Sequence, residues 1–145
     1  MNFYHLSCEV PGGIGAQTVY DKTKIPWELK HLHLRFDGWL GGEILTAESA
    51  VVVSLRLSRA LGFHYSGIVG YQHFFLEKTE TFTRLQSNTE LPKFERIMID
   101  HKIFIDDFAL GKYKELHNQL IISENVRVLL NNYNLGNYRI SKAEY

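Results

Sequence analysis

The segment VVVSLRLSRAL (residues 51–61) has a close counterpart in LIISENVRVLL (residues 120–130), 69 residues further along the chain. In each copy an apolar run, typical of a buried strand, ends at a serine, Ser54 or Ser123. Apolar residues at helical spacing follow, and serine is a preferred residue at the start of a helix. The same offset carries Gly67 onto Gly136, where each copy returns to an extended segment. The pattern predicts two strand–helix–strand units, either a structural pseudo-repeat or two separate uses of a common serine cap.

Further strands are predicted outside the two units, where apolar residues alternate or run together. The clearest is residues 29–36, in which Leu32, Leu34 and Phe36 share one face. Strands are also expected at residues 2–10, 94–99 and 103–105, a helical turn at 112–117, a loop at 12–26, and a long loop or exposed hairpin at 77–93. The sequence therefore predicts one α+β domain over residues 1–145, with a mostly antiparallel or mixed sheet and two or three short helices.

Length and charge limit the number of domains and the kinds of binding partner that we expect. A chain of 145 residues is long enough for one self-contained core. Lys and Arg together number 16, as do Asp and Glu, so no net positive charge favours nucleic acid or an anionic membrane as a partner. The first ten residues lack the features of a signal peptide, and the apolar runs are too short to span a bilayer. We therefore expect a cytoplasmic location, with no nucleic-acid and no membrane partner.

Cys8 is the single cysteine, which excludes an intramolecular disulfide and a zinc site built from four thiolates. We expect it to be a small buried residue of the first strand. The sequence contains no nucleophile motif for covalent catalysis, and the glycines of residues 12–16 are interpreted as a flexible connection rather than a phosphate-binding loop. No catalytic residue and no cofactor are predicted.

His31 and His33 lie on the polar face of the strand predicted at residues 29–36, about 7 Å apart. Two imidazoles at this spacing can share a divalent metal, with an aspartate such as Asp100 or Asp107 as a third ligand. A small metal-dependent hydrolase using His31, His33 and an aspartate is therefore the alternative function. Alternation on a half-buried strand explains the same pattern without a metal, so no metal is included in the predicted site.

The order of several short motifs resembles a known family. The motifs are Tyr4–Val10 followed by a Gly-Gly pair, Trp39–Glu43, Val52–Ser54 before a short helix, Ile105–Phe108, and Ile121–Glu124 with Leu135 beyond. Together they resemble the immunity proteins of bacterial polymorphic toxin systems, a group of cytosolic α+β antidotes. The resemblance spans nearly the whole chain. It implies that the protein binds a cognate toxin domain tightly, either plugging the active site or locking the toxin in an inactive form, without a cofactor.

The family motifs do not map the surface that contacts the toxin, so the candidate binding residues come from residue chemistry. Acidic groups beside loops can mimic the substrate of a nuclease toxin, which selects Glu43, Glu48, Asp106 and Asp107. Trp39 is added because exposed tryptophans are frequent interface anchors, and Trp27 is considered for the same reason. The oligomeric state stays open, and a homodimer is one of the states considered.

Overall fold

The computed structural model describes residues 2–100, 104–113 and 116–144 of the chain. The described residues form three short helices, α1 (Leu55–Leu61), α2 (Glu80–Leu85) and α3 (Glu124–Leu130). The strands are β1 (Phe3–Cys8), β2 (Gly12–Ile14), β3 (Val19–Asp21), β4 (Glu28–His31), β5 (His33–Phe36), β6 (Ile44–Ala47), β7 (Ala50–Ser54), β8 (Ile68–Gln72), β9 (Phe75–Lys78), β10 (Phe94–Ile99), β11 (Phe108–Tyr113), β12 (His117–Ser123) and β13 (Tyr138–Ala143). The predicted α+β class is confirmed.

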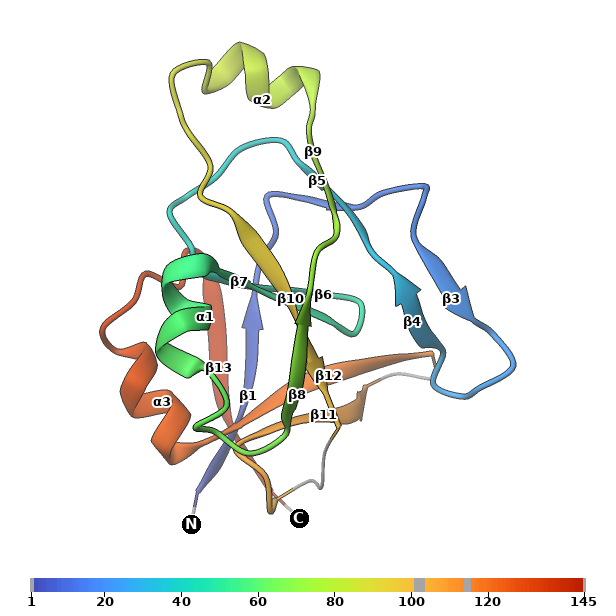
Figure 1. Ribbon diagram of the computed structural model, residues 1–145, viewed down its shortest axis with the longest axis vertical. Helices are drawn as coiled ribbons and strands as arrows, with labels where there is room; N and C mark the ends of the chain where they lie inside the picture. Colours follow the sequence, from blue (N-terminus) through green and yellow to red (C-terminus); the bar gives the residue numbers. More distant parts are fainter. Residues whose placement is uncertain (1, 101–103, 114–115, 145) are drawn as a thin grey trace.

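Two four-stranded sheets form the body of the molecule (Figure 1), with strand orders β11-β12-β1-β13 and β6-β7-β10-β8. A three-stranded sheet, β2-β5-β9, and a two-stranded sheet, β3-β4, extend from them. Neighbouring strands in these sheets pair antiparallel, except that β5 and β9 run parallel. The prediction of mostly antiparallel or mixed sheet is therefore also confirmed.

The two large sheets share one plan. In each, a hairpin (β6–β7 or β11–β12) leads through a short helix (α1 or α3) to a strand at the far edge (β8 or β13). The place between hairpin and edge strand is taken by β10 in the first sheet and by β1 in the second. In the chain, β1 comes before the first unit but lies in the sheet of the second unit. Conversely, β10 comes before the second unit but lies in the sheet of the first. The predicted pseudo-repeat is present, and this exchange of strands joins its two halves.

A carboxylate holds the serine at the start of each repeat helix. Ser54 Oγ accepts the N–H of Leu57 at 3.1 Å and donates to Glu43 Oε1 at 3.1 Å. Ser123 Oγ accepts the N–H of the residue three positions ahead at 3.3 Å and donates to Asp107 Oδ1 at 2.6 Å. Glu43 directly precedes β6 and Asp107 directly precedes β11, so the two carboxylates occupy equivalent places. Both predicted serine caps are confirmed, and each is part of a larger hydrogen-bonded unit.

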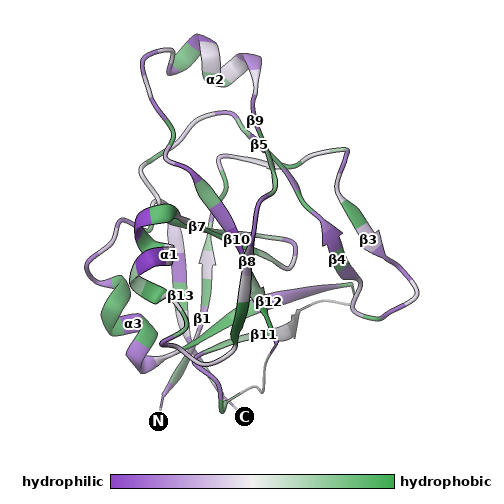
Figure 2. Cartoon of the chain, in the orientation of Figure 1, coloured by the Kyte–Doolittle hydropathy of each residue, from purple (hydrophilic) through white to green (hydrophobic). Residues whose placement is uncertain are grey.

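The largest core cluster lies where the two large sheets and the helices α1 and α3 meet. Each helix has one buried side and carries both hydrophilic and hydrophobic residues (Figure 2). The buried residues of this cluster are Leu6, Cys8, Ile44, Val51, Val53, Leu57, Leu61, Ile68, Ile97, Phe108, Leu120, Ile122, Val126 and Leu130. Cys8 is completely buried, as predicted, and burial raises the pKa of its thiol to about 12. This thiol is therefore protonated at neutral pH and a poor nucleophile.

The prediction of one continuous strand at residues 29–36 is wrong. The structure divides it at Leu32 into β4, which pairs with β3, and β5, which pairs with β2 and β9. Leu32, Leu34 and Phe36 are buried as predicted, and they pack in a second core cluster with Phe82 of α2. The two halves diverge because each follows a different partner strand, which the alternation of one segment does not encode.

Other boundaries also differ from the sequence predictions. Residues 12–26, expected as a loop, contain β2 and β3, and residues 77–93 contain the end of β9 and helix α2. Thr79 starts α2 by accepting the N–H of Phe82. The prediction of a helical turn at 112–117 is wrong, because its described ends belong to β11 and β12. The prediction of a strand at 103–105 is also wrong for Phe104 and Ile105, which lie in a turn. Residues 103, 114 and 115 lie outside the described part of the chain. No helix within the described ranges is long and apolar enough to cross a bilayer.

Candidate functional site

The Glu43 side chain is hydrogen-bonded to other residues of the chain. Its carboxylate receives two hydrogen bonds from the Arg56 guanidinium, at 2.9 Å from Nε and 2.7 Å from Nη2, besides the bond from Ser54. Only 14% of the Glu43 side chain is exposed. The backbone N–H of Glu43 donates to the carbonyl of Asn134, beyond α3. Glu43 therefore links the start of α1 to the second half of the repeat, and toxin contact by this residue stays a prediction.

The Glu43 carboxylate makes stability depend on pH. The Arg56 hydrogen bonds hold its pKa below the usual value of 4.5, aided by Ser54 and opposed by burial. Because the folded pKa lies below the unfolded one, this stabilisation is present above about pH 4.5 and is lost as the pH falls through the folded pKa. We expect Glu43→Gln to lower stability at pH 7 and to make its decline between about pH 5 and 3 shallower. Urea unfolding at a series of pH values measures both, with Glu90→Gln as an exposed control. Equal slopes for wild type and Glu43→Gln would contradict this role.

Asp107 also belongs to the framework. Its carboxylate accepts the backbone N–H of Ser66 at 2.9 Å, the Ser66 hydroxyl at 3.3 Å and the Ser123 hydroxyl at 2.6 Å. Its own N–H donates to Ser66 Oγ at 2.9 Å. Asp106 is half-buried beside it in the bend before β11. The carboxylate of Asp107 thus connects the segment before β8, the start of β11 and the cap of α3, and toxin contact by Asp107 stays a prediction.

Trp39 is half-buried and packs edge-to-face on Phe94, with 6.3 Å between the ring centroids. Its indole N–H donates to the Gly42 carbonyl at 2.9 Å, and its backbone N–H donates to Gln86 Oε1 at 2.6 Å. The polar edge of the ring is therefore already paired within the chain. Leu40, the next residue, is 63% exposed and is the more accessible of the two.

His33 and His31 do not form the exposed pair expected from the sequence. His33 is 4% exposed and stacks on Phe75, whereas His31 is exposed. The Nδ1 atom of His33 accepts the Gln17 N–H at 3.2 Å, so Nε2 carries the proton and donates to Glu77 Oε1 at 2.7 Å. Both ring nitrogens are thus occupied, and His33 has no free lone pair for a metal. Within the described ranges, no group of three or more His, Cys, Asp or Glu side chains could hold a metal ion.

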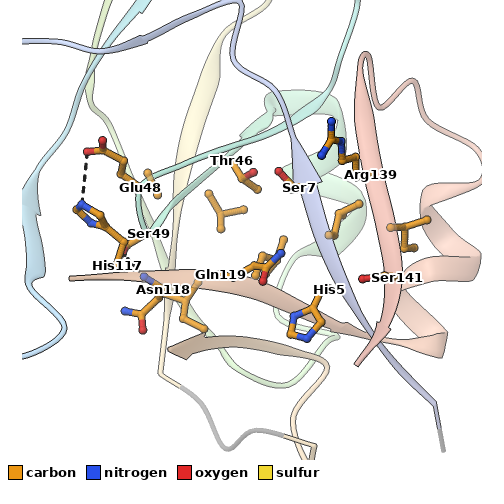
Figure 3. A pocket seen from close by; sticks show the side chains of 16 residues that line it. His5, Ser7, Thr46, Glu48, Ser49, His117, Asn118, Gln119, Arg139 and Ser141 are labelled. Carbon is orange, nitrogen blue, oxygen red and sulfur yellow. Dashed lines mark hydrogen bonds and ion pairs between the residues drawn. The ribbon is translucent and has the colours of Figure 1, made fainter. Parts of the chain in front are cut away.

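A hollow of about 740 Å³ lies between the β11-β12-β1-β13 sheet and the β6–β7 hairpin (Figure 3). His5 and Ser7 of β1, Gln119 of β12, and Arg139 and Ser141 of β13 line it. The strand register puts His5 opposite Ser141 and Ser7 opposite Arg139, so these side chains share one face of the sheet. The hollow also includes Leu6, Thr46, Glu48, Ser49, Ala50, Val51, Leu110, His117, Asn118, Leu120 and Ile140.

A strained turn supplies the acidic side of the hollow. Glu48 and Ser49 form the two-residue connection between Ala47 and Ala50 of the β6–β7 hairpin, with φ of 42° and 75°. Two positive φ angles match the tight hairpin turn usually made by Asn and Gly, and they are costly for other residues. Ser49 Oγ accepts the N–H of Asn118 at 2.8 Å, which fixes the turn against β12. Glu48 is thereby held at the mouth of the hollow.

Aromatic side chains surround Glu48. The hydroxyl of Tyr20 donates to Glu48 Oε2 at 2.8 Å, and His117 Nε2 lies 3.9 Å from the same oxygen (Figure 3). The rings of Tyr20, Trp27 and His117 lie within 5.5 to 5.9 Å of one another, and the Lys22 ammonium sits 4.7 Å from the Trp27 ring. Burial raises the pKa of Tyr20, with a further contribution from its bond to Glu48. We call Tyr20, Trp27, Glu48 and His117 the aromatic rim.

Two histidines of the hollow have unused hydrogen-bonding capacity. The Nδ1 atoms of His5 and His117 are buried and have no hydrogen-bond partner among the described residues. Buried polar atoms are usually paired, so each such atom calls for an explanation. With Arg139 at one side and Glu48 at the other, the hollow presents donors, acceptors and both signs of charge. This chemistry suits the recognition of polar and charged groups on a binding partner.

Of the five candidate residues from the sequence, Glu48 is the one that lines the hollow. The sequence reasoning missed His5, His117 and Arg139, which meet only through long-range strand pairing. The repeat in the sequence does not reveal His5, because β1 (from Phe3) and β10 (from Phe94) are 91 residues apart whereas the two units are 69 residues apart. A scan against protein-family models, a search of curated proteins and a search of solved structures each gave no match to this chain.

Proposed function

We propose that this protein binds and neutralises a cognate bacterial toxin domain by direct contact in the cytoplasm, without catalysis or a cofactor. The observation that carries the proposal is the aromatic rim at the mouth of the hollow. Tyr, Trp and Arg are enriched at the energetic centres of protein interfaces, because their large surfaces are buried at low conformational cost. Arg139 lines the hollow with Glu48 and His117, and the rings of Tyr20 and Trp27 pack against His117.

The residues around the aromatic rim favour a protein as the binding partner over a small-molecule ligand. Val19 and Ile25, which flank Tyr20 and Trp27 in the chain, are 49% and 66% exposed. Ile140 of the edge strand β13 also lines the hollow and is 39% exposed. The hollow thus combines polar groups with apolar residues close to the rim, as protein interfaces do. In this proposal basic toxin side chains meet Glu48 and acidic ones meet Arg139.

The first test is co-expression with the product of the adjacent upstream gene, scoring rescue of growth and co-purification. We expect rescue and a stable complex. A folded protein that gives neither result would overturn the proposal.

Trp27→Ala tests the surface itself. Because a buried aromatic anchor contributes about 2 kcal/mol or more, we expect Trp27→Ala to weaken toxin affinity by about 30-fold or more in calorimetric titration. Phe63→Ala is the matched control, since Phe63 is 69% exposed at the end of α1, away from the hollow-lining residues. Thermal unfolding of both variants shows whether a loss arises from misfolding. Equal affinities for the two folded variants would show that another surface binds the toxin.

A further inference from the structure

A second, smaller hollow of about 220 Å³ contains a buried arginine. Arg96 of β10 is 8% exposed and lines this hollow together with Gln17, Lys30, His31, Leu32, His33, Gln72, His73, Phe74 and Phe75. In the pseudo-repeat, Arg96 occupies the place of His5. Phe94 pairs with Ser54 and Arg96 with Val52, just as Phe3 pairs with Ser123 and His5 with Ile121.

The Arg96 guanidinium is incompletely paired. Its Nη2 donates to the Leu29 carbonyl at 3.1 Å, while Nε and Nη1 are buried without a hydrogen-bond partner among the described residues. Burial accordingly lowers its pKa, although the negative charge of Glu28 acts in the opposite direction. Glu28 is itself paired with Lys24 and Lys30. A buried cation whose donors are incompletely paired lowers stability, so Arg96 is costly for the fold.

The other polar residues around Arg96 add positive charge and hydrogen-bond donors. Lys30 is cationic, His31 and His73 are exposed imidazoles, and Gln17 and Gln72 carry amide donors. No Asp or Glu is among the described residues that line the hollow. Two of the lining residues are paired with carboxylates outside the lining, the Lys30 ammonium with Glu28 and the His33 ring with Glu77. The hollow is therefore matched to an anion.

We propose that this hollow binds a tetrahedral oxyanion of the phosphate type, either inorganic phosphate or the phosphate group of a small ester. A guanidinium carries five N–H donors in a planar fork that fits phosphate oxygens, and the Nε and Nη1 atoms of Arg96 have no hydrogen-bond partner among the described residues. Lys30, which also lines the hollow, supplies a second positive charge. A volume of about 220 Å³ has room for a phosphate group together with several water molecules. This site stands independently of the toxin partner proposed above.

Thermal unfolding of the whole chain with added inorganic phosphate tests the proposal. At a phosphate concentration tenfold above Kd, we expect Tm to rise by roughly 3–6 °C relative to sodium chloride of equal ionic strength. Acetate should have no comparable effect, because one planar carboxylate cannot use donors on several sides. Phosphoserine, compared with phosphate, distinguishes an esterified from a free anion, and stabilisation by either supports the site.

Two variants locate the site. Arg96→Met should fold with equal or higher stability in chloride, because it removes an unpaired buried charge, and should lose the phosphate response. Lys30→Gln should weaken phosphate binding by about 3- to 10-fold. Lys24→Gln is the matched control, since Lys24 also pairs with Glu28 but does not line the hollow, and its affinity should stay within about twofold of wild type.

The proposal is overturned if phosphate gives no more stabilisation than chloride, or if acetate stabilises equally. It is also overturned if Lys30→Gln keeps the full phosphate response, and this outcome remains decisive even if Arg96→Met does not fold.

Discussion

Replacing Gly67 by alanine is expected to lower the free energy of unfolding by about 4 kcal/mol or more, a large fraction of the roughly 5–15 kcal/mol of a typical domain. Gly67 has φ of 95°, in the region that favours glycine. A Cβ at this position would lie 2.0 Å from the carbonyl oxygen of Phe108, a backbone atom of β11 that cannot rotate away. The N–H of Phe108 donates to the Ser66 carbonyl at 3.0 Å, so β8 and β11 are held close at this point. Relief of the clash would separate them.

Gly13→Ala is the matched control for Gly67→Ala. Gly13 lies in β2, and a Cβ built there would meet no atom within 4 Å. Its stability should change by less than about 1 kcal/mol, as for a glycine replaced where the backbone and the space allow it. Urea unfolding followed by circular dichroism measures both variants. If Gly67→Ala unfolds at the same urea concentration as Gly13→Ala, the close approach of β8 and β11 is wrong.

Asp107→Ala should cost about 3 kcal/mol of stability. It removes a carboxylate that accepts three hydrogen bonds, from the Ser66 N–H, the Ser66 hydroxyl and the Ser123 hydroxyl. Hydrogen bonds to a charged group contribute about 1.5–3 kcal/mol each, and partial exposure reduces their sum. The loss also frees the Ser123 hydroxyl that caps α3, so we expect hydrogen exchange to increase in α3 as well as at the start of β8.

Asp100→Ala is the control for Asp107→Ala. Asp100 is exposed just beyond β10, and its backbone N–H donates a hydrogen bond to the Gly67 carbonyl. Its replacement should change stability by less than about 0.5 kcal/mol. The comparison also separates two roles for Asp107. A folded Asp107→Ala variant of unchanged stability that fails to bind the toxin would favour the toxin-contact hypothesis over the structural role.

The two hollows can be compared through the repeat. His5 and Arg96 occupy equivalent positions on β1 and β10, and both carry buried nitrogen atoms that find no hydrogen-bond partner in the described part of the chain. The hollow at His5 is larger and bears both signs of charge, whereas the hollow at Arg96 is smaller and lined by positive and neutral groups. The same backbone frame therefore supports two different binding chemistries, one proposed for a protein surface and one for an oxyanion.

Local sequence patterns were sufficient for the elements whose signals lie within a few residues. The helices at 55–61 and 124–130 begin at Ser54 and Ser123 as predicted, because a serine side chain caps a helix through an N–H three residues away. Cys8 and the apolar residues of the second half of the 29–36 segment are buried as their alternation indicated. Helix α2 was missed, since its six residues include two threonines and offer little helical periodicity.

The sequence by itself determined the α+β class, the two serine-capped helices and the apolar faces of most strands. Only the tertiary structure decided that β1 and β10 exchange places, that His33 is buried against Glu77, and that Glu43 and Asp107 hold the capping serines. The reason is that alternation along a strand specifies which side chains face inward, but not which distant strand lies beside them. The hollows and their unpaired nitrogen atoms arise from those long-range pairings.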